Sequence, residues 1–259
     1  MIHFITICAT NKHEKSLPAI DLYKGGYWNI VQEISKKVDK TWILSAKYGL
    51  IPSTKKISPY KLSFKPDSQD YIGHLDLNPT NYWDSITCYD SNNSINKLIT
   101  DNPQDKFILY ASFSYIKAIQ NDLLPVINNS NLFIFSPDTK GKQFKPFILN
   151  TSLKARYILG GNKITITAKT INHFIDNVNK IGWDKDNINK YFTNMVKDCP
   201  EYEYKPVKKK INDEFLIQLI KEIGKSKPKT TILKNISSKG FACGPNRLSR
   251  ILNKLKIIE

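Results

Sequence analysis

The chain of 259 residues carries 39 lysines and arginines against 23 aspartates and glutamates, a formal net charge of +16. Its hydrophobic content of 41% suffices for a core, and its length fits one large domain or a medium domain with a small one. No apolar run reaches the ~18 residues that a membrane-spanning helix needs, so we expect no contact with a membrane. The charge favours a polyanionic partner, most simply nucleic acid, although a lysine excess shaped by an AT-rich genome would also raise it.

Cysteine usage and the N-terminus bear on chemistry and location. Cys8, Cys88, Cys199 and Cys243 lie far apart and form no Cys-x-x-Cys pair, so no zinc or other metal site is expected. No Gly-x-Gly-x-x-Gly fingerprint is present, and we expect no cofactor. Few cysteines, and an N-terminus without a basic n-region or a cleavage site, predict a reduced, cytoplasmic protein.

Strands and helices alternate over residues 1–200. Residues 2–7 predict a strand, residues 28–38 an amphipathic helix, and residues 41–46 a second, central strand. A strand, a helix and a strand in this order form a βαβ unit and imply a parallel sheet. We therefore expect an α/β fold in which a central, mostly parallel sheet is flanked by helices. The later expected elements are strands at 106–111, 132–135 and 164–166 and helices at 115–124, 151–157, 170–178 and 191–197.

Two segments predict loops. Residues 65–94 are rich in Asp, Asn, Ser, Pro and aromatic residues without a clean period, which indicates a long ordered loop with a short helix near Tyr82 and Trp83. Residues 136–143 form a polar loop with two lysines, which would either hold a phosphate or be solvated.

The segment Trp42-Ile43-Leu44-Ser45-Ala46-Lys47-Tyr48-Gly49 begins as a buried strand and ends in polar residues. Ser45, Lys47 and Tyr48 come at the strand's carboxyl end, where open α/β sheets bind ligands. Gly49 permits a backbone conformation closed to other residues, and so a sharp turn. The segment predicts a ligand site, and the alternative is a strand that ends in an ordinary polar turn.

Polar residues follow two further strands. After residues 2–7 come Cys8, Asn11 and Lys12, which would bring backbone N–H groups and an ammonium near an anion, or would form an ordinary loop. Ser112 and Tyr115 follow the strand at 106–111 and form a second junction like that at Ser45.

The last part of the chain differs in composition. Residues 201–210 indicate a basic linker, and residues 211–259 predict helices at 214–224, 231–237 and 246–255. Three short helices fit a small C-terminal helix-turn-helix or winged-helix-like module. From residue 205 onward, 14 lysines and arginines stand against 4 acidic residues, which favours a nucleic-acid-binding module.

The final predicted helix has a polar side of the residue types that contact phosphates and base edges, and the alternative is a solvated surface helix. The predicted DNA-binding residues are Lys208, Lys209, Lys210, Asn246, Arg247, Arg250 and Lys254.

Four motifs together resemble a known family. They are Cys8-x-x-x-Lys12, Pro18-Ala19-x-x-Leu22-Tyr23, the string Ile43-Leu44-Ser45-Ala46-Lys47-Tyr48-Gly49-Leu50, and Pro59-Tyr60. Residues 1–125 thereby resemble the prokaryotic and phage domains of unknown function often called YaaA-like, and the eight-residue string is the specific part.

The chain departs from this family at two places. Lys61 stands where the family usually has an acidic residue, and residues 112–115 replace a Gly-Arg-x-Tyr-like segment. The family is distantly similar to domains of base-modifying enzymes of the tRNA-guanine transglycosylase and archaeosine synthase type. The resemblance implies chemistry at a base or at an N-glycosidic bond.

These features favour a DNA glycosylase-like enzyme that flips out a base, in our expectation a modified one, and removes or exchanges it, in a role such as phage defence. Breaking an N-glycosidic bond places positive charge on the sugar and negative charge on the departing base. Asp21 is the predicted catalytic carboxylate, with Lys47 and Ser45, although an aspartate at a helix start is an equal alternative. The predicted base- or substrate-binding residues are Cys8, Asn11, Lys12, Tyr23, Tyr48, Tyr60, Ser112 and Tyr115.

Cys8 itself is expected to be a buried strand-end residue rather than a nucleophile. The expected partner is DNA, double-stranded or locally unpaired. Two other functions stay open: a non-catalytic DNA-binding regulator with a ligand-sensing α/β domain, and an enzyme acting on free nucleotides. A sensor needs no carboxylate against a sugar, and an enzyme on free nucleotides does not need the basic tail.

Overall fold

A computed structural model describes residues 1–88, 93–137, 143–149, 151–201, 209–224 and 226–257. The chain forms two compact units, Met1–Glu201 and Tyr202–Glu259, which we call the front unit and the tail unit.

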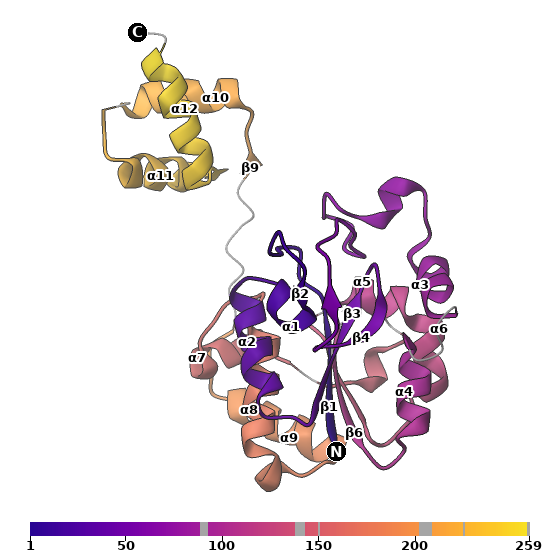
Figure 1. Cartoon of the computed structure of the whole chain (residues 1–259). Coiled ribbons are helices and arrows are strands. Elements are labelled where there is room, and N and C mark those ends of the chain that lie inside the picture. Colours follow the sequence, from indigo (N-terminus) through magenta and orange to yellow (C-terminus); the bar gives the residue numbers. More distant parts are fainter. Residues whose placement is uncertain (89–92, 138–142, 150, 202–208, 225, 258–259) are drawn as a thin grey trace. The chain divides into compact units, whose positions relative to one another are not determined.

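The front unit is built on a six-stranded sheet with the order β4-β3-β1-β6-β7-β8 (Figure 1). Neighbouring strands run parallel, except that β4 pairs antiparallel with β3. The mostly parallel sheet of the predicted α/β fold is thus confirmed. The strands are β1 (Ile2–Ile7), β3 (Lys40–Ser45), β4 (Gly49–Pro52), β6 (Lys106–Tyr110), β7 (Leu132–Phe135) and β8 (Ile148–Leu149), and a separate antiparallel pair joins β2 (Leu17–Pro18) to β5 (Lys56–Ile57).

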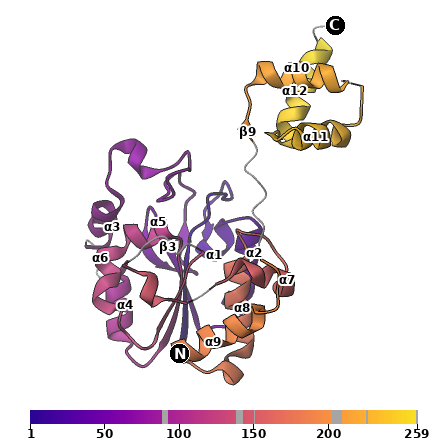
Figure 2. The same ribbon diagram turned by 180° about the vertical axis from the view of Figure 1, so that it is seen from behind.

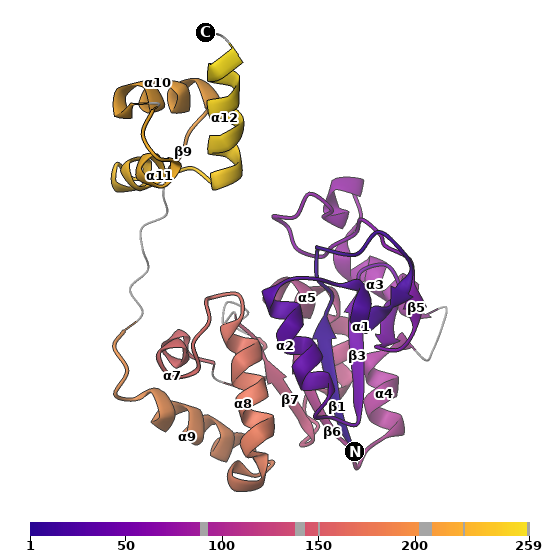
Figure 3. The ribbon, with the colours of Figure 1, turned by 60° about the vertical axis from the view of Figure 1, so that its left-hand side comes forward.

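Helices cover both faces of this sheet, as the two opposite views in Figures 1 and 2 show. One layer holds α2 (Gly26–Ser35), α7 (Arg156–Leu159), α8 (Ile166–Ile181) and α9 (Lys185–Val196), and the other holds α3 (Pro79–Cys88), α4 (Ile95–Asp101), α5 (Phe113–Ala118) and α6 (Gln120–Leu123). Within the first layer α2 packs directly against α8 (Figure 3), although more than a hundred residues separate them in the chain.

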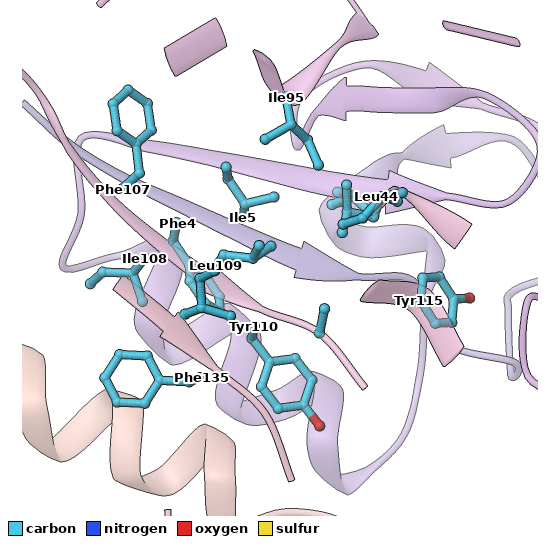
Figure 4. Packing of buried hydrophobic residues seen from close by; sticks show 14 of the residues in the cluster. Phe4, Ile5, Leu44, Ile95, Phe107, Ile108, Leu109, Tyr110, Tyr115 and Phe135 are labelled. Atoms are coloured by element: carbon cyan, nitrogen blue, oxygen red, sulfur yellow. The ribbon is translucent and has the colours of Figure 1, made fainter. Parts of the chain in front are cut away.

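The central strands supply an unbroken apolar core because both faces of the sheet are covered. Phe4, Ile108, Leu109 and Phe135 are fully buried and belong to this core (Figure 4). Trp28 of α2 is buried as well, and its indole N–H donates to the Ile20 carbonyl at 2.7 Å. It is therefore a core residue and not a platform for stacking bases.

One predicted strand is wrong. Residues 164–166 are β-branched and predict a strand, yet Ile164 and Thr165 form a turn and Ile166 is the first residue of α8. The Asn162 side chain accepts hydrogen bonds from the N–H groups of Ile164 and Thr165, at 2.9 and 3.2 Å. The Asn162 carbonyl accepts from Ile166 N–H as well, so local hydrogen bonds override the strand propensity.

The described residues of the tail unit form three helices near their predicted bounds: α10 (Asp213–Ile223), α11 (Lys229–Ser238) and α12 (Pro245–Ile257). A short parallel pair joins β9 (Lys209–Lys210) to β10 (Phe241–Ala242). Leu216, Ile220, Ile232 and Leu248 belong to a separate apolar core. Membership of the helix-turn-helix or winged-helix class stays a prediction.

Candidate functional site

The strand order creates a switch point in the front unit. From β1 the chain moves outward to β3 on one side, and it later returns to β6, β7 and β8 on the other side. Such a reversal leaves a crevice beyond the carboxyl ends of the strands, where ligands bind in open α/β sheets. A cavity of about 500 Å³ lies there, lined by residues that follow β1, β6 and β7 and by the starts of α2 and α8. We call it the switch-point cavity, and its volume is within the usual range for a small-molecule site.

Tyrosines contribute three of the lining residues of the cavity. Tyr27, Tyr110 and Tyr115 line it, and the rings of Tyr27 and Tyr110 lie 5.1 Å apart between centroids. The Tyr27 hydroxyl bonds to Thr6 Oγ1 at the end of β1. Burial raises the pKa of Tyr27 and of Tyr115 well above the ordinary value of 10.0. Both hydroxyls therefore stay protonated at neutral pH and can donate hydrogen bonds, but they cannot act as bases.

Positive charge surrounds the cavity. Lys24, Lys65 and Lys163 line it and are exposed. Gly25 and Gly26 line it too, at the start of α2, where no side chain among the described residues caps the helix and Gly25 has a φ of 120°. The uncapped N–H groups carry the positive end of the helix dipole. The rim thus suits an anionic or electron-rich ligand.

Cys8 lies between the cavity and the protein interior. It lines the cavity, is 7% exposed, and its sulfur lies 3.1 Å from the Tyr115 hydroxyl. Its backbone N–H donates to the Leu44 carbonyl of β3. The expected buried position at the end of a strand is confirmed.

A hydrogen-bonded cluster lies behind this wall. The hydroxyls of Tyr23 and Tyr60 are 2.8 Å apart, and Ser45 Oγ donates to Tyr60 at 2.8 Å. Ser45 is fully buried and accepts from the N–H groups of Lys47 and Tyr48 at 3.3 and 3.1 Å. None of these residues lines the switch-point cavity, and the Ser45 hydroxyl closes the turn after β3.

A second cavity of about 430 Å³ lies beside the cluster and shares Thr10 with the first. Lys12, Tyr60 and Asp70 line it, with Lys12 Nζ 4.3 Å from the centre of the Tyr60 ring. Burial lowers the pKa of Lys12, while the Cys8 thiol and the Asp70 carboxylate oppose that shift. Asp70 also lines a third cavity, of about 300 Å³, together with Thr10 and Lys65.

The structure does not gather the predicted catalytic residues in one place. Asp21 is exposed in α1 (Ala19–Leu22), and Lys47 is exposed with its Nζ 5.1 Å from the Tyr48 ring. Neither residue lines the switch-point cavity, and no carboxylate stands among the described residues that do. Of the predicted binding residues, Cys8, Asn11, Ser112 and Tyr115 line this cavity, Lys12 and Tyr60 line the second, and Tyr23 and Tyr48 line neither.

Several lining residues are not predicted by the sequence. Lys24, Gly25 and Tyr27 contribute to the cavity from the segment that opens α2. Lys163 and Ile164 also line it, although residues 164–166 predict a strand. Residues 138–142 of the predicted phosphate loop lie outside the described residues, and Pro137 just before them lines the cavity.

The predicted DNA-binding arginines are engaged within the tail unit. Arg247 donates to Asp213 at 2.6 and 2.9 Å and to the Ile211 carbonyl at 2.7 Å. Arg250 donates to the other oxygen of Asp213 at 2.9 Å. Both arginines therefore fix α12 to the start of α10, and Lys209 is exposed. Lys208 lies outside the described residues, as do the side chains of Lys210, Asn246 and Lys254.

Two negative findings apply to the described part of the chain. No group of three or more His, Cys, Asp or Glu residues there is arranged to hold a metal ion. No helix within those residues combines the length and apolar character needed to cross a bilayer.

The fold and the cavity define an α/β protein with a ligand-sized cavity at the switch point of its sheet. The chain belongs to a family of unknown function, DUF6884, which it matches over residues 2–134. No curated protein and no solved structure matches it. The resemblance to a family of uncharacterised domains is thus confirmed in that form, whereas a relationship to tRNA-guanine transglycosylases is not shown.

Proposed function

We propose that the protein is a DNA glycosylase-like enzyme that takes a flipped-out, modified base into the switch-point cavity and cleaves or exchanges its N-glycosidic bond, with phage defence as a biological role. The observation that carries this proposal is the combination of a tyrosine-walled cavity with a lysine rim at the switch point of the sheet.

The walls suit a flat aromatic ligand that has polar edges. A base that leaves the stack is held between aromatic side chains and read by hydrogen bonds to its edge. Tyr27, Tyr110 and Tyr115 supply the aromatic surface, and Asn11 and Ser112 supply side-chain donors and acceptors. The lysines at the rim match the phosphates on either side of an extruded nucleotide.

The chemistry requires charge stabilisation at both ends of the breaking bond. On the base, the Tyr115 hydroxyl, which lines the cavity and lies 3.1 Å from the Cys8 sulfur, would donate to the negative charge that develops as the base departs. For the sugar, we assign the carboxylate to Asp70 in place of Asp21. Asp70 is half-buried and lines both adjoining cavities, whereas Glu14 and Asp67 are exposed and each line one.

The tail unit supports a DNA partner through its charge. Residues 205–259 contribute +10 of the net +16, and the linker contains Lys208, Lys209 and Lys210. An enzyme acting on free nucleotides has no use for this charge, whereas a DNA enzyme gains affinity by releasing counterions.

The test is base release from DNA. The protein is incubated with unmodified DNA and with duplexes carrying modified purines or pyrimidines, including glycosylated ones, and released bases are measured by mass spectrometry together with alkali-sensitive breaks. We expect release from one modified substrate. Asp70→Asn should abolish it, and Asp21→Asn, a matched change at an exposed helical carboxylate, should not.

A non-catalytic regulator is the second candidate, because no carboxylate lines the switch-point cavity within the described residues. This function predicts tight binding to DNA without base release from any substrate, and DNA affinity that changes when a base or nucleoside is added. Full base release by the Asp70→Asn variant would agree with the enzymatic function but would show that Asp70 is not its catalytic carboxylate.

A further inference from the structure

Ile164 is exposed at the cavity and belongs to none of the apolar clusters formed by the described residues. Its exposure of 72% is the highest of the large hydrophobic residues in the described part of the chain, and it lines the switch-point cavity. Single exposed hydrophobic residues are common on proteins and need no explanation. The inference therefore depends on how Ile164 is held and on what surrounds it.

The backbone around Ile164 is fixed by local hydrogen bonds. Asn162 Oδ1 accepts from the Ile164 N–H at 2.9 Å, and Asn162 N–H donates to Thr165 Oγ1 at 3.0 Å. Lys169 of α8, which follows the turn, donates through Nζ to the carbonyl of Leu159, which precedes it, at 2.9 Å. At Gly161, with φ of 91°, a Cβ would approach Thr165 Oγ1 to 2.8 Å, so the close approach requires glycine. The isoleucine is thus presented on a rigid turn, and its own β-branched side chain is stiff.

The turn lies beside the positive start of α2. A Cβ placed on Gly26 would lie 4.0 Å from the Thr165 methyl group, so residues 162–165 and the start of α2 border the same opening. Lys163 precedes Ile164 in the turn, and Lys24 precedes the helix. An apolar tip flanked by cations suits a polyanion that also offers apolar surface, as stacked bases in DNA do.

We propose that Ile164 is a wedge that enters the base stack of duplex DNA and occupies the space left by the base held in the switch-point cavity. This inference rests on the proposed function. Apolar side chains that insert between base steps separate them, and the larger protein–DNA interface that forms on the opened duplex offsets the cost of unstacking. A rigidly held, β-branched residue suits this role because little conformational freedom is lost on insertion.

The wedge is required only where a stack must be opened. The Ile164→Ala variant should lose about tenfold in base release or base extrusion on duplex DNA, and it should match the unaltered protein on single strands. Extrusion is followed by the fluorescence of 2-aminopurine placed at a mismatch, which rises when the base leaves the stack. Ile158→Ala is the matched control, because Ile158 is 50% exposed on α7 and does not line the cavity.

The outcomes separate this inference from the function on which it rests. If the unaltered protein extrudes a base and Ile164→Ala does so equally on duplex DNA, the wedge is wrong and the function stands. If the unaltered protein extrudes no base from any DNA, both are wrong. Loss of self-association in Ile164→Ala, measured by sedimentation, with unchanged extrusion would make Ile164 a contact between copies of the chain and overturn the wedge.

Discussion

The carboxyl ends of β1 and β3 are neighbours in the sheet, and both are followed by polar residues. At β3, Ser45 and the turn after it use their polar groups on each other and on Tyr60. At β1, Cys8 and Asn11 border a cavity, because the reversal of strand order leaves space between the segments that follow β1 and β6. A polar strand end therefore becomes a site only where the topology leaves it uncovered.

The largest expected effect comes from removing Tyr60, which lies at the centre of the hydrogen-bonded cluster after β3. Tyr60→Ala deletes a buried ring and its two hydroxyl contacts, so the free energy of unfolding should fall by about 3–5 kcal/mol in urea titrations. Tyr48→Ala, at a half-buried ring in edge contact with Tyr60, should cost clearly less. A loss below about 1 kcal/mol for Tyr60→Ala would contradict a structural role.

Alanine variants of Ser45 and Ser112 compare the buried strand end with the one that lines the cavity. Ser45→Ala leaves two backbone N–H groups without their acceptor and removes one of the two hydroxyl contacts of Tyr60, which should cost about 1–3 kcal/mol. Ser112→Ala, at the half-buried strand end that lines the cavity, should change stability by less than about 0.5 kcal/mol. Only Ser112→Ala should weaken ligand binding in titration calorimetry. The reverse order of effects would place the ligand at β3.

At the amino end of β1, away from the cavity, His3 should make the stability of the front unit depend on pH. His3 is buried, accepts from the Trp42 indole at Nδ1 and bonds to Asp105 through Nε2, and burial lowers its pKa below the ordinary 6.5. Above pH 6.5 the imidazole is neutral in the folded and the unfolded chain, and stability is at its full value. As pH falls below 6.5, the unfolded chain takes up the proton first, so stability falls by at most about 1.4 kcal/mol per pH unit.

This pH dependence is measured as the urea midpoint between pH 7.5 and pH 5.5. The His3→Gln variant should be less stable at pH 7.5 and should lose less on acidification. His74→Gln, at an exposed histidine, is the control and should keep the slope of the unaltered protein. An unchanged slope in His3→Gln would show that other groups set it.

The smallest expected effect concerns the rim. Replacing both Lys24 and Lys65 with glutamine should reduce the magnitude of the slope of log K for DNA binding against log salt concentration by about 1.8. Each phosphate contact contributes about 0.9 to that slope. Folding should be unaffected because both side chains are exposed. Lys40→Gln, at the amino end of β3, serves as the control and should leave the slope in place. An equal drop for Lys40→Gln would indicate non-specific charge attraction.

The sequence predicts the type of most elements and much less of the site. The apolar run of β6 and β7 and the helical period of α2 are local signals, and the structure confirms them. The strand predicted at residues 164–166 does not form, because the Asn162 side chain accepts hydrogen bonds from N–H groups that a strand would need. The sequence does not predict the strand order, since β1 pairs with β6 across about a hundred residues and no local pattern records that pairing.

The site shows the same limit. Cys8, Asn11 and Ser112 are predicted because they follow strands, and the structure places them at the cavity. Ser45 follows the same rule and is buried, because the turn at Gly49, with φ of 71°, folds β4 back over it. Asp70 is not predicted because it lies in a segment without periodicity, where spacing carries no information about proximity.

The division of the cavity lining along the chain has a consequence for diversification. Most lining residues lie within residues 7–115, in the segment that matches the family, whereas Pro137, Lys163 and Ile164 come after it. The cavity lining is therefore encoded in two separate stretches. If the cavity binds a ligand, replacement of the later stretch would alter three of its lining positions while the lining from residues 7–115 keeps its chemistry.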